Sequence, residues 1–395
     1  MPTYHLRLSE PLPAGLGDEL AKRVYYIAPG IDSFSLVFGD DRVVGVDLDT
    51  EGEEDPAALA RKLDLVSRTE VLPQRPTAPE VVWTSPHPTA VRPDAFQELK
   101  RLGAVHEMGP GTVATGQLFT DVLDALDRDI RTIATEEFGA ARYRYPALIG
   151  TAELMRGGYP VSFPQHVLTA SHVRPDPEVY RDFVAGAADA HDLAAHIERH
   201  SGHAGYCLPP TMCFHTYVQL SGERLAEGTT VVTSRGKSFR YESRYHHSLE
   251  RLWDFTIREV VFLGEAAEVA RCRRGFLDAA CEFVAELGLA GTVERAHDPF
   301  FGDATVPRRV LAQTLSGLKY ELRLPVDDDR TVAAASFNLH GTVFGERYGI
   351  TGPDGATVHT ACVGFGLERL TFALFCRYGA DQERWPAGLR ARLLG

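Results

Sequence analysis

Arg240 and Glu242 stand two residues apart in the segment Phe239-Arg240-Tyr241-Glu242, and together they could bind a phosphate and an amine. Side chains two apart in an extended chain point to the same face. A guanidinium binds phosphate through paired hydrogen bonds, and a carboxylate accepts from an amine or a ring nitrogen. The same four residues also fit a salt pair on the surface of a strand, so the segment alone leaves both interpretations open.

Glu259 lies on an apolar face of the strand predicted between residues 251 and 264. Alternation puts Phe255, Ile257, Glu259 and Val261 on one face, and Thr256, Arg258, Val260 and Phe262 on the other. A carboxylate on a buried face needs a cation, a hydrogen-bond donor or a proton. In the loop before this strand, His246 and His247 fit either a solvated tip or a pair of ligands.

Cys362 stands at the end of another predicted strand, in the segment 359–370. Gly364 and Gly366 follow it, and they allow a sharp strand-to-helix turn and a close approach of a ligand to the backbone. Arg369 then falls on the first turn of the predicted helix. Cys362 therefore fits a ligand, but it also fits an ordinary core residue.

The elements that must position these residues mix helices and strands without a regular βαβ rhythm. The helices are expected at 17–26, 55–66, 95–102, 118–137 and 265–287. Between them, runs such as YHLRL, SFSLVF, RVVGVDL, TTVVTS and FTIREVVFLG read as strands, and Gly39-Asp40-Asp41 reads as a hairpin turn. This pattern predicts an α+β fold with a largely antiparallel sheet flanked by helices.

The distribution of prolines divides the chain. Six of them between residues 73 and 93 predict an extended linker. We therefore expect a small α/β N-terminal domain of unknown role at 1–72, a proline-rich linker at 73–93 and a second, larger domain at 94–395.

Composition narrows the class of protein. The chain has 395 residues, a formal charge of −13 and six scattered cysteines without a CxxC pair. A disulfide framework or a zinc ribbon is therefore not expected. The sequence contains no run of eighteen apolar residues and no secretory pattern at its start, so we expect a cytoplasmic protein without a membrane span.

Three segments in order resemble the motifs of the class II aminoacyl-tRNA synthetases. FGAARYRYPALI, with Pro146, is similar to motif 1, FRYE with RLWDFTIRE to motif 2, and GFGLERLTFALF to motif 3. HTACVGFGLERLTFALF, AASFNLHGTVFGERYGI, HDPFFG and SFPQHV resemble a narrower group, the amino acid:carrier-protein ligases, which are relatives of the atypical zinc-containing seryl-tRNA synthetases. The resemblance runs from about residue 94 to the end, so it implies that residues 94–395 form a class II synthetase-like catalytic domain.

The resemblance implies a zinc ion held by Cys213, Glu259 and Cys362, with Cys207 as an alternative to Cys213. Two thiolates and a carboxylate leave a fourth zinc position open, which suits a substrate amine. It also implies catalytic roles for Arg240, Glu242 and Arg369, and a site for ATP. The implied ATP-binding residues are Arg240, Glu242, Arg251, Leu252, Ala335, Ser336 and Arg369. Where the class often carries an acid for Mg²⁺, this chain has Val332-Ala333-Ala334-Ala335, so the magnesium ligands stay unassigned.

The implied activity is ATP-dependent formation of an aminoacyl-adenylate from a small amino acid, followed by transfer to the phosphopantetheine thiol of a carrier protein. The family also implies a homodimer formed through residues 118–149. The alternatives are an atypical seryl-tRNA synthetase, a ligase with a small amine acceptor, and an inactive paralogue that senses amino acid or nucleotide.

The acidity of residues 1–72 makes tRNA the less expected acceptor. That segment has seven lysines and arginines against fourteen acidic residues, and such a charge repels a phosphate backbone. Carrier proteins are usually acidic, so we expect a small basic patch on the catalytic domain. Arg271, Arg273 and Arg274 are its first candidates, although they fit a solvated helix face as well.

Overall fold

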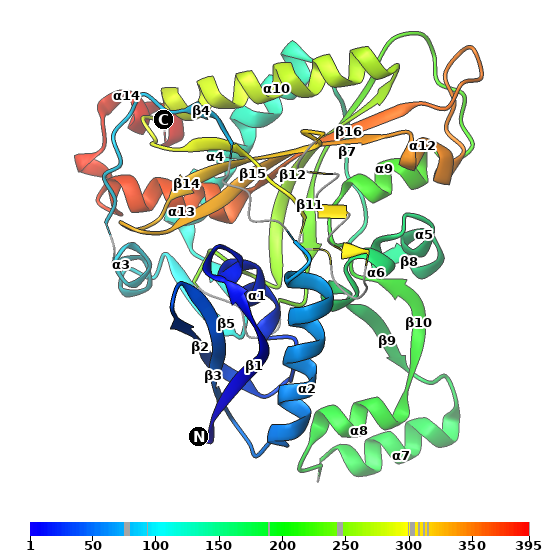
Figure 1. Ribbon diagram of the computed structural model, residues 1–395. Helices are drawn as coiled ribbons and strands as arrows, with labels where there is room; N and C mark the ends of the chain where they lie inside the picture. The colour runs from blue at the N-terminus through cyan, green and yellow to red at the C-terminus, as the bar shows by residue number, and fades with distance from the viewer. Residues whose placement is uncertain are drawn as a thin grey trace.

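Two main sheets, one of three strands and one of eight, organise this computed structural model. It describes residues 1–74, 80–92, 94–188, 190–242, 248–298, 300, 305–306, 309–310, 313 and 316–394. The mixture of antiparallel sheets and helices confirms the predicted α+β class. Figure 1 shows the long helix α10 (Ala266–Glu286) on one side of the larger sheet and the N-terminal elements, in blue, on the other.

The N-terminal segment builds a three-stranded sheet in the order β1-β3-β2 with helices packed on it. Its elements are β1 (Thr3–Pro13), α1 (Gly17–Val24), β2 (Ile31–Gly39), β3 (Arg42–Thr50) and α2 (Pro56–Val66). The hairpin turn lies where the sequence predicts it: Asp40 and Asp41 have φ angles of 48° and 57°, the left-handed region that aspartate tolerates. The Asp55 side chain accepts a hydrogen bond from the Ala57 amide and so caps α2. Apolar residues between Leu6 and Val71 form a separate buried cluster.

The larger sheet has eight strands in the order β4-β13-β14-β15-β16-β12-β11-β7. They are β4 (Val81–Thr84), β13 (Thr292–Arg295), β14 (Lys319–Pro325), β15 (Thr331–Gly341), β16 (His359–Gly366), β12 (Asp254–Gly264), β11 (Thr230–Phe239) and β7 (Ala141–Tyr143). All neighbours are antiparallel except β7, which runs parallel to β11. Residues 81–84 lie inside the expected linker, yet they form the edge strand β4 and pair with β13.

One face of this sheet is covered by helices. Val260 and Phe262 of β12 and Val363 of β16 share a large core with α4, α10 and α13. The helices that contribute to this core or lie at its edge are α3 (Ala95–Arg101), α4 (Gln117–Thr132, continued by a π turn at Ile133–Glu137), α10, α13 (Leu367–Tyr378) and α14 (Ala387–Leu394). Within the described residues, no helix is long and apolar enough to cross a membrane.

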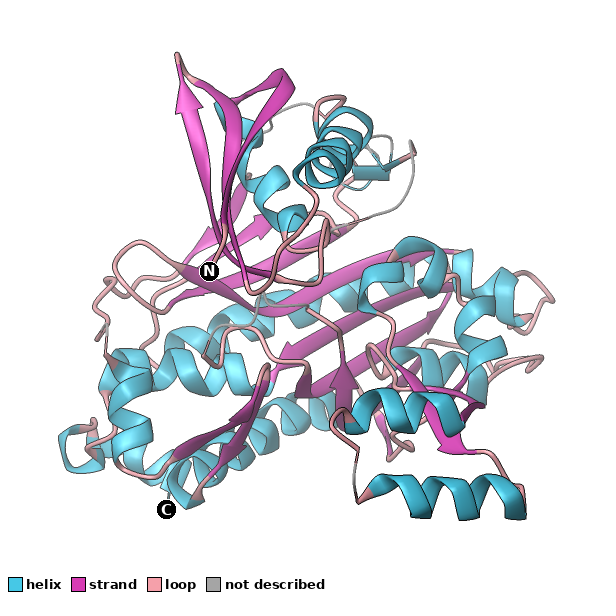
Figure 2. Cartoon of the chain, turned by 90° about the horizontal axis from the view of Figure 1, so that it is seen from below, coloured by secondary structure: helices cyan, strands magenta, loops and turns pink. Residues whose placement is uncertain are grey.

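The opposite face carries shorter elements around a second cluster that includes Val261 and Cys362. These elements are α5 (Thr151–Arg156), α6 (Tyr159–Ser162), α9 (Cys213–Gln219) and α12 (Val343–Tyr348), with the small sheet of β8 (Ile149–Gly150), β10 (Ser201–Cys207) and β9 (Thr169–Val173). β5 (Val105–Gly109) and β6 (Thr112–Thr115) form a separate hairpin. Figure 2 shows α7 (Pro177–Ala187) and α8 (Leu193–His200) as a pair that projects from the body.

Candidate functional site

Cys213, Glu259 and Cys362 meet on the face of the sheet that α9 covers. Their potential ligand atoms all lie within 4.8 Å of one another, and all three residues are buried. β12 and β16 are antiparallel neighbours with Val261 opposite Cys362 and Glu259 opposite Gly364, so Glu259 and Cys362 come from adjacent strands. Cys213 is the first residue of α9. The predicted alternation is confirmed, because Arg258 and Val260 face the helices while Glu259 faces the cluster.

Glycine at position 364 keeps room beside the carboxylate. A Cβ atom there would lie 2.9 Å from Ile257 Cδ1 and 3.9 Å from Glu259 Oε1. The space next to Glu259 would therefore be reduced by any side chain, which fits the expected close approach of a ligand to this backbone.

The described partners of Glu259 are neutral groups. Its Oε2 accepts from the Thr211 hydroxyl at 2.6 Å and from the Cys213 amide at 2.8 Å. Burial raises the pKa of Glu259 to about 8, and the neighbouring Cys362 adds to that rise. A buried carboxylate with so high a pKa is stabilised by a cation. Two sulfurs and one carboxylate oxygen form a donor set that zinc accepts, so these residues fit a metal ion.

The two thiols are not equivalent. A hydrogen bond between them lowers the pKa of Cys362 and raises that of Cys213, and burial raises Cys213 further. Cys362 also contacts His340 Nε2 at 3.7 Å and Asn338 Nδ2 at 3.6 Å. The Nδ1 atom of His340 lies 3.2 Å from Thr360 Oγ1, which orients the ring. His340 and Asn338 thus support the cluster from outside, a role the sequence interpretation missed.

Cys207 does not belong to this group. It is buried on β10, and its sulfur lies 3.8 Å from the Thr151 hydroxyl. Among the described residues, the group that could hold a metal ion contains Cys213 instead.

Three arginines converge beside the cluster. The Arg251 guanidinium donates to Glu242 Oε2 at 3.1 Å. Arg369 Nε donates to the Glu250 carbonyl at 2.6 Å, and Arg240 Nε donates to the Pro210 carbonyl at 3.2 Å. Burial lowers the pKa of Arg369 to about 10, and the positive charges of Arg251 and Arg240 contribute to that decrease. Crowded guanidiniums of this kind attract a polyanion such as a triphosphate.

Glu242 is buried within this cationic region. Burial alone would raise its pKa, but the guanidiniums of Arg251, Arg240 and Arg369 hold the pKa of this carboxyl below its usual range. His166 Nε2 lies 4.0 Å from Glu242 Oε2. Burial lowers the pKa of His166 to about 4, so the imidazole is neutral at pH 7. The segment SFPQHV contains this histidine, but its spacing carries no signal for a contact with Glu242.

The other residues implied to bind ATP, Leu252, Ala335 and Ser336, are not all exposed to a ligand in the same way. Leu252 and Ala335 are buried in the core on the helix side, so only their backbones are available to a ligand. Ser336 is part-buried, and its hydroxyl accepts from Asn338, the residue that also contacts Cys362. The stretch Val332–Ala335 offers no carboxylate. Glu321, which lies opposite Ser336 on β14, and Asp298 are both within 3.0 Å of Lys319 Nζ.

The expected basic patch on α10 is largely neutralised. Arg271 pairs with Glu268, and Arg274 lies 3.4 Å from Asp278. Arg273 lies over the Tyr320 ring and donates to the Gly317 carbonyl at 3.0 Å. These contacts favour the interpretation of the three arginines as part of a solvated helix face over that of a basic patch for a carrier protein. His246 and His247 lie outside the described residues, so their interpretation stays open.

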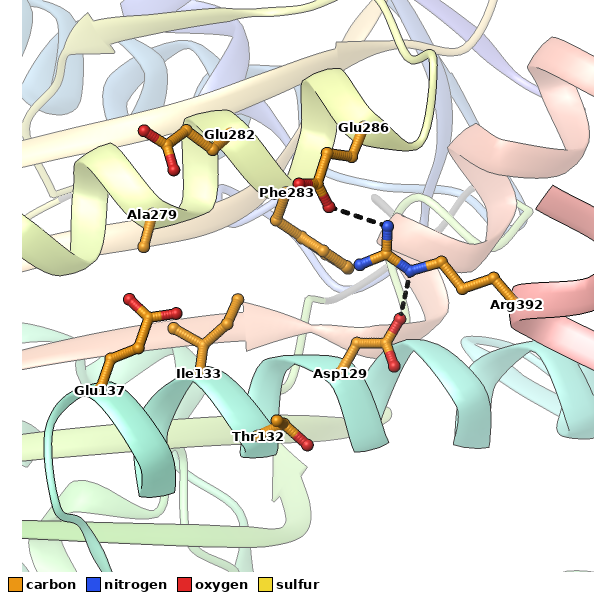
Figure 3. Close-up of a pocket in the computed structure, with 9 residues that line it drawn as sticks. All are labelled: Asp129, Thr132, Ile133, Glu137, Ala279, Glu282, Phe283, Glu286 and Arg392. Carbon is orange, nitrogen blue, oxygen red and sulfur yellow. Dashed lines mark hydrogen bonds and ion pairs between the residues drawn. The ribbon is translucent and has the colours of Figure 1, made fainter. Parts of the chain in front are cut away.

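A cavity of about 270 Å³ lies away from the cluster, between α4, α10 and α14 (Figure 3). Arg392 reaches into it and donates to Asp129 at 2.8 Å and to Glu286 at 2.9 Å. Its lining includes Glu137 and Glu282 as well, and none of the predicted site residues. It is therefore distinct from the candidate site.

Comparison with known proteins finds ligases that are similar to most of this chain. No protein-family model matches the sequence. It is similar to amino acid–[acyl-carrier-protein] ligases 2 and 1 of Bradyrhizobium diazoefficiens, at 32% and 30% identity over 72% of this chain and 84% and 86% of theirs. It is also 26% identical to the type-2 serine–tRNA ligase of Methanococcus aeolicus, over 76% of this chain and 59% of that protein.

A solved structure extends the likeness in fold. The Methanopyrus kandleri seryl-tRNA synthetase, crystallised with a tRNA(Sec) of A. aeolicus, matches with a TM-score of 0.70 at 22% identity. The match covers 98% of this chain and 76% of that one, so it includes the N-terminal segment. It confirms the predicted class II synthetase fold.

Proposed function

We infer the reaction from one premise: this chain belongs to the amino acid–[acyl-carrier-protein] ligase family. We propose that it activates a small amino acid with ATP as the aminoacyl-adenylate and transfers the aminoacyl group to the phosphopantetheine thiol of a carrier protein. The proposal includes a zinc ion, and Mg²⁺ that accompanies ATP.

The observation that carries the proposal is the link between the two groups of side chains. The Pro210 carbonyl accepts from Arg240, and the next residue, Thr211, donates to Glu259. A short stretch of backbone thus fixes the spacing between the arginines and the Cys-Glu-Cys cluster. An adenylation site needs such a pair of neighbouring subsites, one for phosphates and one for the amino acid.

In the activation step, a carboxylate oxygen of the amino acid would attack the α-phosphorus of ATP, and the bond to pyrophosphate would break. Arg240 and Arg369 would neutralise the charge that develops on the phosphate oxygens. Glu242 would accept a hydrogen bond from the adenine amine, because its carboxyl is held ionised. No protein nucleophile is required.

The cluster would select the amino acid. Cys213, Glu259 and Cys362 would hold zinc, which when bound leaves a fourth position for a neutral substrate amine. A hydroxy acid lacks that amine and would be rejected. In the transfer step the carrier thiol would attack the acyl carbon, AMP would leave with the bonding electrons, and the thiol proton would pass to solvent.

A tRNA-charging activity is the second candidate, and one observation favours it. The fold match to the seryl-tRNA synthetase covers 98% of this chain and therefore reaches residues 1–72. The charge of that segment is unfavourable for it, since fourteen acids face seven bases and one of the bases, Arg23, is buried between Glu19 and Glu70.

The first test is amino-acid-dependent ATP–pyrophosphate exchange across the twenty amino acids. We expect the highest rate with glycine, alanine or serine and no exchange with the matching hydroxy acids. The highest rate with a large aromatic amino acid would refute the proposed substrate class. Absence of exchange with every amino acid would refute the activity.

The second test separates the acceptors. Labelled amino acid is supplied with ATP and either a phosphopantetheinylated carrier protein, its apo form as a control, or total tRNA. We expect label on the phosphopantetheinylated carrier alone. Charging of tRNA without any labelling of the carrier would replace the acceptor in this proposal and leave the activation step intact.

A further inference from the structure

A buried arginine connects the N-terminal segment, residues 1–72, to residues 94–395, here called the catalytic part because they contain the candidate site. Arg23, at 2% exposure, donates from Nε to Glu70 at 3.1 Å and from Nη1 to the Glu19 carbonyl at 2.7 Å. Its Nη2 donates to the carbonyl of Phe300 at 2.9 Å, across 277 residues of sequence. His297 Nε2 lies 3.5 Å from Glu19. Phe300 and His297 therefore both contact the group formed by Arg23 and its two glutamates. The end of α1 is therefore held in a fixed position against the catalytic part.

Aromatic rings continue this contact toward the arginines. Phe300 stacks on Phe163, with centroids 5.4 Å apart, and Phe163 stacks on His166 at 6.2 Å. Tyr26, which follows α1, places its ring edge-on to His166 at 6.3 Å and an interplanar angle of 65°. His166 thus lies between a ring from the catalytic part and a ring from the N-terminal segment.

His166 in turn contacts the segment that contains Glu242. Its carbonyl accepts from the Tyr241 amide at 3.2 Å, and its Nε2 lies 4.0 Å from the Glu242 carboxylate. Burial raises the pKa of Tyr26 well above its ordinary value, and the charge of Glu242 adds to the rise, which agrees with the closeness of the two side chains. Glu242 also pairs with Arg251, so its orientation depends on both neighbours.

We propose that Tyr26 is a positioning residue of the ATP site: its ring holds His166 against Glu242, and residues 1–72 are thereby part of the nucleotide-binding machinery. This inference rests on the proposed function, because it assumes that Glu242 meets the adenine of ATP. Loss of the ring would leave His166 and Glu242 free to reorient. Binding of ATP would weaken. The amino-acid subsite around Glu259, to which no described contact of Tyr26 extends, would keep its affinity.

The test compares Tyr26→Ala, Tyr26→Phe and Tyr25→Ala in the full-length protein. Tyr25 is the matched control, because it is the adjacent tyrosine and its ring packs on Phe34 within the N-terminal segment, at 5.0 Å. ATP binding is measured by calorimetry, and KM for ATP and for the amino acid by pyrophosphate exchange. Thermal unfolding of each variant shows whether it is folded at the assay temperature.

We expect Tyr26→Ala to weaken ATP binding and raise KM for ATP by about tenfold, with KM for the amino acid within about twofold of the wild type. Tyr26→Phe keeps the ring and should restore ATP binding. Tyr25→Ala should bind ATP like the wild type. Equal ATP affinity in Tyr26→Ala and wild type, or equal weakening in Tyr25→Ala, would overturn the inference.

Two outcomes separate this inference from the proposed function. If the wild type binds ATP but exchanges no pyrophosphate with any amino acid, the proposed activity fails and the calorimetry of Tyr26→Ala still decides the role of Tyr26. If the wild type does not bind ATP, both fail. If Tyr26→Ala is unfolded, the comparison is made on Tyr26→Leu, which must weaken ATP binding relative to Tyr26→Phe.

Discussion

Asp127 on α4 and Arg258 on β12 form a buried bidentate ion pair that joins the helix layer to the central strand of the site. Arg258 Nε and Nη2 donate to the two Asp127 oxygens at 2.7 and 2.8 Å, and both side chains are at most 7% exposed. Arg258 is the residue directly before Glu259. The pair therefore fixes the strand at the point where its opposite face carries the candidate metal ligand.

Removal of Asp127 should destabilise the fold strongly. Asp127→Ala leaves Arg258 buried without its partner, so we expect the free energy of unfolding to fall by about 3–5 kcal/mol. Asp124→Ala is the matched control one turn earlier on α4, since its 54% exposed side chain pairs with Arg235 at the surface. That change should cost less than about 1 kcal/mol. If chemical denaturation showed the same loss of unfolding free energy in Asp127→Ala and Asp124→Ala, the buried pair would not have the stabilising role described here.

Zinc retention should depend on the three residues of the cluster. We expect about one zinc per chain in the freshly purified protein, and loss of the metal in Cys362→Ser and Glu259→Gln because an incomplete donor set binds weakly. Cys207→Ser and Cys272→Ser remove buried thiols outside the cluster and should keep the metal. Elemental analysis checks this. A zinc-free wild type, or full retention in Cys362→Ser, would rule the site out.

The guanidiniums of Arg240 and Arg369 should be needed for activation. Arg240→Lys and Arg369→Lys remove the paired donors, so we expect pyrophosphate exchange to slow by about a hundredfold or more. Arg377→Lys, on the same helix as Arg369, changes an arginine that contacts Ala90 and Tyr378 and should exchange at nearly the wild-type rate. Wild-type exchange rates in both site variants would remove the arginines from the reaction.

His166 should make the folded state sensitive to mild acid. Burial lowers its pKa from an ordinary 6.5 to about 4. Between those values the unfolded chain binds a proton that the folded chain does not, so stability falls as the pH decreases from 6.5 toward 4. From pH 7.5 to pH 5 this residue should account for about 2 kcal/mol of lost stability.

The measurement is chemical denaturation at both pH values, with His166→Gln compared to the wild type. The variant should lose less stability over this interval, and His172→Gln, at an exposed histidine on β9, should follow the wild type. Wild-type and His166→Gln curves that fall in parallel would show that His166 is not the titrating group.

The homodimer expected from the family resemblance has a candidate edge in β7, the last strand of the large sheet. All of its residues are exposed, and an exposed edge strand offers unpaired backbone groups to a partner. We expect a dimeric mass at micromolar concentration by analytical ultracentrifugation, and a weaker dimer in Tyr143→Glu. Tyr180→Glu, an equally exposed tyrosine on the projecting α7, should stay dimeric. A monomeric wild type with full activity would refute the dimer.

The local sequence determined where helices, strands and turns form and which face of the sheet each strand side chain points to. Helical periodicity depends on residues a few positions apart, and so do the start of α2 at Asp55-Pro56 and the turn at Asp40-Asp41. These elements could therefore be predicted without the rest of the chain. Strand alternation likewise predicted that Glu259 and Arg258 point to opposite faces of the sheet. The motifs that resemble the class II synthetases, read in order, predicted the fold, and the family resemblance predicted Glu259 and Cys362 with either Cys213 or Cys207 as the third member of the cluster.

Only the tertiary structure decided which residues meet. Cys207 and Cys213 are both buried and six residues apart, and the docking of α9 beside β12 and β16 brings only Cys213 to Glu259. The same holds for β4, which pairs with a strand more than two hundred residues away, and for Tyr26 and His166 beside Glu242. Spacing and periodicity describe neighbours along the chain, whereas these contacts depend on how distant elements pack, and no local pattern encodes that packing.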